Sequence, residues 1–116
     1  MLSTGQVRDW WRRTQDVCHY CAVSVDGYLV FKERLLGYDG PSRLVHGVRQ
    51  QHFGRLREAA RMSIDRRDNE NGYVEGNLVK ACVVCNLVKA GVLDEEEMNF
   101  VGPHLRHRLA KALGIA

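Results

Sequence analysis

The chain has 116 residues, of which 45% are hydrophobic and 27% charged, and its formal net charge is +3 at pH 7. This composition suits an ordinary globular protein, and the length favours one domain covering 1–116. No apolar run approaches the roughly 18 residues that cross a bilayer, and the opening MLSTGQVRDWWRRTQ lacks the apolar core of a secretion signal. We therefore expect a cytoplasmic protein with no membrane partner.

The first half of the chain predicts helices separated by loops. A short helix is expected over about 3–14, where apolar residues recur on one edge. The apolar runs after VCHYC, which a DG pair interrupts, are compatible with a hairpin or with a helix over 28–36. Glycines and a proline predict a loop over 37–47, and a helix over about 48–61 follows it.

The second half predicts two strands and further helices. MSID and NLVKA are expected to be strands separated by the turn RRDNENGY, and CVVCNLVKAG leads into a short helix. Asp94 and Glu97 form a capping box that begins the next helix. Gly102-Pro103 is expected to break that helix, so that a final amphipathic helix, HLRHRLAKALG, ends at Gly114.

The four cysteines form two CxxC pairs and leave no cysteine over. Cys18 and Cys21 make the first pair, and Cys82 and Cys85 make the second. Such pairs in a cytoplasmic protein favour metal binding over disulfides. Four thiolates satisfy tetrahedral Zn²⁺ and leave no open position, which predicts a structural site. A redox CxxC, an iron–sulfur cluster and unliganded buried thiols are the alternatives, and His19 could compete as a ligand.

The segment SIDRRDNENGYVEGNLVKACVVCNLVKAG, 63–91, resembles the core of the HNH endonucleases, which have the ββα-metal fold. The matching pattern contains an acid at the end of the first strand (Asp65), an asparagine that opens the second strand (Asn77), and an asparagine and a lysine on the following helix (Asn86 and Lys89). The upstream CxxC pair also resembles members of this family in which zinc fixes the core.

The resemblance implies an α+β fold class: a small ββα-metal core, also called HNH or His-Me finger, held by a four-cysteine zinc site and flanked by helices. Within a single domain, 3–21 would form the N-terminal helix and first zinc knuckle. The core would cover about 63–91, and C-terminal helices would cover 94–113.

The resemblance also implies a second metal site. Asp65 and Asn86 would hold a catalytic Mg²⁺ or Mn²⁺, and carboxylate and amide oxygens are ligands that suit these ions. The ion would polarise the scissile phosphate and stabilise the leaving oxygen. Asn77 would orient the loop between the strands through hydrogen bonds and would not contact the substrate.

Arg66 departs from the family pattern, in which a histidine at this position is the general base. A guanidinium with a pKa above ~12 cannot accept a proton near neutral pH, so we expect Arg66 to grip a phosphate oxygen or to stabilise charge in the transition state. The sequence therefore does not identify the general base. His52 is our first choice and His46 our second, while Asp68 or Glu70 could position the water, or the ion alone could activate it.

These observations predict a metal-dependent endonuclease that hydrolyses DNA phosphodiester bonds. The arginine-rich stretch 43–67, together with Lys80 and Lys89, would contact phosphates. One alternative is a catalytically inactive, zinc-stabilised module on the same fold that binds nucleic acid, and another is a zinc-stabilised interaction domain. The oligomeric state is open, since the last helix could pack on its own core or on a partner.

Overall fold

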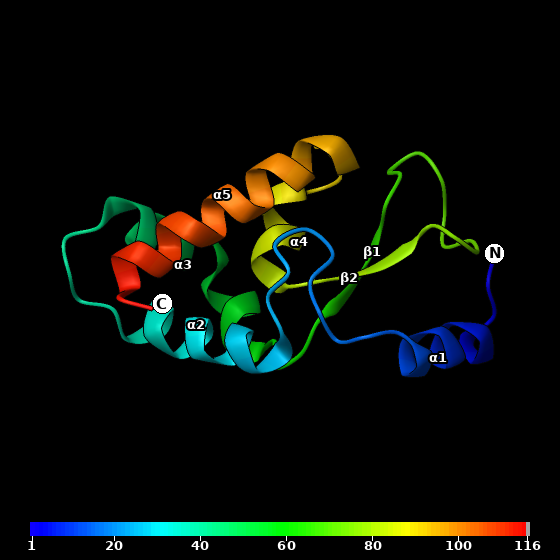
Figure 1. The fold of residues 1–116 in the computed structure, drawn as a ribbon, viewed down its shortest axis with the longest axis horizontal. Coiled ribbons are helices and arrows are strands. Elements are labelled where there is room, and N and C mark those ends of the chain that lie inside the picture. The colour runs from blue at the N-terminus through cyan, green and yellow to red at the C-terminus, as the bar shows by residue number, and fades with distance from the viewer. Residues whose placement is uncertain (116) are drawn as a thin grey trace.

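In the computed structural model, which describes residues 1–115, the chain forms five helices and one two-stranded antiparallel sheet (Figure 1). This arrangement confirms the predicted α+β class. In chain order the elements are α1 (Thr4–Arg13), α2 (Val25–Gly37), α3 (Arg43–Glu58), β1 (Ser63–Arg66), β2 (Leu78–Ala81), α4 (Val83–Lys89) and α5 (Glu95–Leu113). None of the described helices combines the length and apolarity needed to cross a membrane.

Serine caps fix where the first three helices begin. Ser3 accepts a hydrogen bond from the Gln6 amide and completes a capping box, and Ser24 caps α2 through the Gly27 amide. The segment after the first CxxC pair is therefore a helix and not a hairpin. Ser42 caps α3, so this helix begins five residues before the expected 48. The predicted loop over 37–47 was too long, because the stabilisation of the helix start by Ser42 exceeds the helix-destabilising effect of Gly47.

The sheet places the core motif at the centre of the molecule. β1 pairs with β2 in the register that sets Asp65 opposite Val79. β2 leads directly into α4, whose N-cap is Cys82, and α4 packs against β1. Figure 1 shows α4 between the sheet and α5, while α1 extends away from the body beside the β1–β2 loop. Two strands and a following helix thus form the predicted ββα unit.

The expected break at Gly102-Pro103 is wrong, because α5 continues through Pro103. Packing explains the difference. Met98 and Leu109 are buried on either side of the proline, and a Cβ added to Gly102 would lie only 3.0 Å from Cβ of Tyr20. The glycine therefore allows a close approach between α5 and the first CxxC loop, and this contact holds the helix together across the proline.

Candidate functional site

The four cysteines form one buried cluster. Their Sγ atoms all lie within 4.8 Å of one another, and the Sγ atoms of Cys21 and Cys82 are 3.9 Å apart. Tetrahedral zinc with Zn–S bonds of about 2.3 Å would place its sulfur ligands about 3.8 Å apart. Hydrogen bonds from Cys21, Cys82 and Cys85 lower the pKa of Cys18, which favours a thiolate within the cluster. Donor type, number and spacing all fit zinc.

The cluster joins two segments that are distant in the sequence. We call Cys18–Cys21 the first knuckle and Cys82–Cys85 the second knuckle. The first knuckle also docks on the sheet, because the His19 amide donates to the Lys80 carbonyl at 2.8 Å. The His19 ring does not join the cluster, since its Nε2 lies 2.7 Å from Oε2 of Glu95. Zinc would therefore hold the N-terminal loop against the start of α4.

Asp65 lies next to this cluster with one carboxylate oxygen already occupied. The Tyr20 hydroxyl donates to Oδ2 of Asp65 at 2.5 Å, and Nζ of Lys89 lies 3.1 Å from the same oxygen. The Asp65 side chain is 13% exposed. Burial and the hydrogen bond to Asp65 raise the pKa of Tyr20, so its hydroxyl remains a donor at neutral pH. Both contacts use Oδ2, which leaves Oδ1 as the oxygen for another partner.

Lys89 is buried and fully hydrogen-bonded. Its side chain is 1% exposed, and Nζ donates to the Arg66 carbonyl at 2.6 Å and to Oδ1 of Asn69 at 2.5 Å. With Asp65, these acceptors match the three hydrogens of an ammonium group. The expectation that Lys89 contacts phosphate is therefore wrong: this lysine ties α4 to β1 and to the β1–β2 loop.

Lys80 is also buried, which contradicts the same expectation for this residue. Its Nζ donates to the carbonyls of Trp11 and Thr14 and to Oδ1 of Asp16, and it lies 4.1 Å from the centre of the Trp11 ring. These contacts attach the end of α1 to β2. Lysines are rarely buried unless they are paired, and both buried lysines here have complete sets of acceptors.

Asn86 lies on α4 one turn before Lys89, and residues spaced by three share a helix face. Lys89 contacts Asp65 from that face, so helix spacing predicts that Asn86 also faces β1, although none of the described side-chain contacts joins Asn86 to Asp65. Asn86 is half-buried. The two residues therefore lie on elements that pack against each other, Asn86 on α4 and Asp65 on β1.

Asn77 anchors the β1–β2 loop. Its Oδ1 accepts from the Asp68 amide at 2.9 Å, and its Nδ2 donates to the carbonyls of Asp68, Asn71 and Gly72. The side chain is buried and its hydrogen bonds are directed into the protein. Arg66 lies at the entrance of the same loop, half-buried, with Cζ 5.6 Å from the centre of the Tyr73 ring.

The two histidines considered as bases lie on α3. His52 has non-helical dihedral angles, φ −122° and ψ 17°, and shares the inward face of α3 with Val48 and Leu56. Burial lowers the pKa of His52, so the imidazole is neutral near pH 7. The described contacts of the Asp65 carboxylate go to Tyr20 and Lys89, and none goes to His52.

His46 is occupied at both ring nitrogens. Nε2 lies 2.6 Å from the Gly40 carbonyl and Nδ1 lies 2.6 Å from a guanidinium nitrogen of Arg49. Through these two contacts His46 fixes the α2–α3 loop. It has no nitrogen left for a water molecule.

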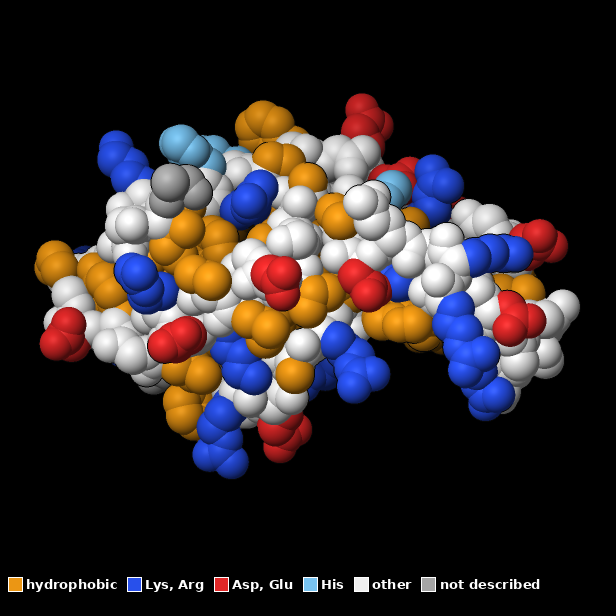
Figure 2. All heavy atoms as spheres, turned by 60° about the horizontal axis from the view of Figure 1, so that its bottom comes forward, with side chains coloured by type: hydrophobic (Ala, Val, Ile, Leu, Met, Phe, Trp, Pro, Cys, Tyr) orange, Lys and Arg blue, Asp and Glu red, His pale blue; other side chains and the backbone are white. Residues whose placement is uncertain are grey.

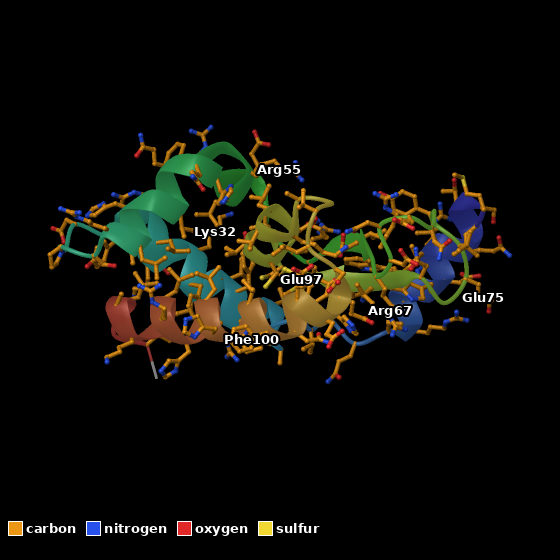
Figure 3. The ribbon with its side chains drawn as sticks, turned by 90° about the horizontal axis from the view of Figure 1, so that it is seen from above. Lys32, Arg55, Arg67, Glu75, Glu97 and Phe100 are labelled. Atoms are coloured by element: carbon orange, nitrogen blue, oxygen red, sulfur yellow. The ribbon has the colours of Figure 1, made fainter. Side chains whose placement is uncertain are left out.

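The arginine-rich stretch does not form one surface. Figure 3 places Arg55 along α3 and Arg67 beside the start of α5, on different sides of the molecule. Arg67 bonds the Glu95 carboxylate through Nε at 2.7 Å, and Arg49 donates to the carbonyls of Leu35 and Tyr38. Exposed basic residues also come from outside the stretch, and Figure 2 shows several Lys and Arg side chains at the end of the molecule that α1 occupies.

Sequence reasoning missed Tyr20 and the role of Lys89. Tyr20 lies between two zinc-ligand positions, which is the one feature of the sequence that could have drawn attention to it. Lys89 was expected to contact phosphate. Neither contact with Asp65 follows from local sequence, since Tyr20 is 45 residues from the aspartate.

Comparison with known structures identifies the fold. The chain is similar to the rare-cutting HNH restriction endonuclease PacI, with a TM-score of 0.59 and 24% sequence identity. The similarity covers 92% of this chain and 63% of the PacI chain, so this chain spans less than two thirds of the protein it matches. No family model and no curated protein sequence matches the chain. At this identity the likeness shows the fold alone, and it confirms the HNH-type core suggested by the sequence.

Proposed function

We propose that this protein is a metal-dependent endonuclease that hydrolyses DNA phosphodiester bonds, with a single Mg²⁺ or Mn²⁺ held by Asp65 and Asn86. The observation that carries the proposal is the placement of Asp65. The described contacts of its carboxylate use Oδ2, and Asp65 lies on β1, against which α4, the helix that bears Asn86, packs. The chain also has the fold of a protein named as an HNH restriction endonuclease. The DNA partner is inferred from that neighbour and from the exposed arginines.

The chemistry of the donor set supports the ion. A carboxylate oxygen and an amide oxygen are hard ligands, and Mg²⁺ or Mn²⁺ prefers such ligands and keeps positions for water and phosphate. When bound, such an ion polarises the scissile phosphate and stabilises the leaving oxygen. Asp65 would supply Oδ1 from the sheet and Asn86 its side-chain oxygen from α4.

The remaining residues would position the substrate and move the proton. Arg66, at the entrance of the loop that Asn77 anchors, would donate to a non-bridging phosphate oxygen. His52 is the proposed base, because its neutral imidazole can accept a proton from the attacking water. Zinc at the two knuckles would have a structural role, since four sulfur ligands leave no position for substrate.

A binding module without catalysis is the second candidate. Two observations favour it: Lys89 balances the charge of Asp65 within the protein, and Arg66 replaces the usual histidine. We prefer the enzyme because the Asp65 carboxylate would repel a DNA phosphate that it faced directly. A cation bound to the carboxylate would instead attract that phosphate.

Plasmid cleavage separates the two candidates. We expect nicking or linearisation by the zinc-loaded protein in Mg²⁺ or Mn²⁺, and its loss in Asp65→Asn and Asn86→Ala. Asp16→Asn is a matched control because Asp16 also pairs with a buried lysine, and Asn99→Ala removes an exposed asparagine from α5. DNA binding without cleavage under both metals would exclude the enzyme. Cleavage retained in Asp65→Asn would exclude the assigned site.

A further inference from the structure

Of the two groups that hold the Asp65 carboxylate, one lies in the first knuckle and the other follows the second knuckle on α4. Tyr20 lies inside the first knuckle, between Cys18 and Cys21, and its hydroxyl donates to Oδ2. Lys89 lies one helical turn after Cys85 of the second knuckle, and its ammonium contacts the same oxygen. One buried sulfur cluster therefore fixes two donors that converge on one oxygen from two segments of the chain.

Packing fixes the position of the Tyr20 hydroxyl. Tyr20 is 4% exposed, and the His19 ring meets it edge-on at 5.1 Å between centroids. On its other side Gly102 of α5 approaches so closely that an added Cβ would lie 3.0 Å from Cβ of Tyr20. With its ring held by the knuckle and by α5, Tyr20 offers its hydroxyl at one place.

A carboxylate with a fixed orientation is preorganised to bind an ion. Asp65 would otherwise rotate about its terminal torsion, and an ion would have to arrest that rotation when it binds. Hydrogen bonds to a ligating carboxylate fix its orientation, and removing them typically weakens metal affinity by about 10- to 100-fold. Because Tyr20 and Lys89 both engage Oδ2, Oδ1 is directed away from them.

We infer that Tyr20 is a positioning residue for the catalytic ion: its hydroxyl, held by the first zinc knuckle, orients Asp65 so that Oδ1 faces the cation. This inference rests on the proposed function. It adds a task for the zinc cluster beyond folding, since the cluster sets the direction of a carboxylate that does not touch it. Tyr20 itself contacts neither substrate nor ion.

The test is Mn²⁺ binding to the full, zinc-loaded chain without DNA, measured as free Mn²⁺ by electron paramagnetic resonance up to millimolar concentration. Tyr20→Phe removes the hydroxyl and keeps the buried ring. Tyr28→Phe is the matched control, because Tyr28 is also buried and its hydroxyl donates to the Ala59 carbonyl at 2.9 Å. Zinc content and the thermal unfolding midpoint are measured for each variant.

We expect Tyr20→Phe to weaken Mn²⁺ binding about tenfold or more, with zinc content retained, and Tyr28→Phe to bind Mn²⁺ like the wild type. Equal affinity in the two variants overturns the inference and leaves the nuclease proposal standing. Loss of zinc in Tyr20→Phe also overturns it, because the hydroxyl would then serve the knuckle. If Asp65→Asn binds Mn²⁺ as the wild type does, both the inference and the proposed ion site are wrong.

Discussion

Replacing the buried ammonium of Lys89 by an apolar group should destabilise the protein strongly. Lys89→Met keeps the length of the side chain but leaves Asp65, whose side chain is 13% exposed, without its counter-charge. It also leaves the Arg66 carbonyl and Oδ1 of Asn69 without this donor. Breaking a buried pair by removing one partner costs about 3–5 kcal/mol, and we expect a loss of that size in the free energy of unfolding.

Comparison with Lys80→Met separates the cost of leaving Asp65 without a counter-charge from the cost of leaving backbone carbonyls unpaired. Lys80 is as buried as Lys89 and also has three acceptors, but its acidic partner Asp16 has a side chain that is 53% exposed. Water can solvate Asp16 once the lysine is gone, so this substitution should cost only the unpaired carbonyls, about 1–3 kcal/mol. The expected difference between the two variants is therefore about 2 kcal/mol.

Urea unfolding followed by far-UV circular dichroism, at a fixed excess of zinc, measures both losses. The excess is needed because a metal that binds the folded state shifts the apparent stability. Combining Lys89→Met with Asp65→Asn tests the source of the effect, since removing both charges should recover about 1–3 kcal/mol relative to additivity. If Lys89→Met costs no more than Lys80→Met and the double variant shows no coupling, Asp65 is not balanced by Lys89.

Two further predictions concern protons and zinc. Burial lowers the pKa of His52 from its ordinary 6.5. The cleavage rate should therefore increase with pH through a midpoint below 6.5 and become constant above it, and His52→Gln should not show this increase. As the pH drops, His52 takes up a proton in the unfolded chain at a higher pH than in the folded chain. The free energy of unfolding of the wild type should therefore fall relative to that of His52→Gln below pH 6.5, and parallel stability profiles of the two proteins would refute this. Removing zinc with a strong chelator should unfold the chain by circular dichroism, since zinc contributes on the order of 10 kcal/mol in small domains, and Zn²⁺ but not Mg²⁺ should restore it. A zinc-free chain with an unchanged spectrum would contradict this.

Local chemistry explains which parts of the fold could be predicted from the sequence. Helix caps act within three or four residues, and the Asp94–Glu97 capping box is formed as expected. The two CxxC pairs specify a four-sulfur cluster because their spacing suits one ion wherever the chain brings them together. The strand, loop, strand and helix order of the core follows from turn residues between two short apolar runs.

Contacts between distant segments explain the failures. Pro103 signals a helix break in any local reading, yet α5 is held across it by residues buried on both sides. Lys80 and Lys89 read as surface residues by type. Each is buried because backbone carbonyls and an acid from other elements surround its ammonium group. No sequence window around either lysine contains that complete set of acceptors.

In the candidate site, too, local sequence indicates some residues, whereas others depend on contacts between distant segments. Asp65 and Asn86 could be proposed as ion ligands from the motif because they belong to the short ββα unit. The base could not be assigned, since His52 comes from α3, a helix whose placement depends on the whole core. The contact that holds Asp65 was also hidden, because it comes from Tyr20, 45 residues away in the sequence, and we propose that the cysteine cluster fixes this tyrosine. During gradual removal of zinc in the presence of excess Mg²⁺, cleavage should therefore be lost before the chain unfolds completely, because Asp65 loses its orientation when the first knuckle loosens.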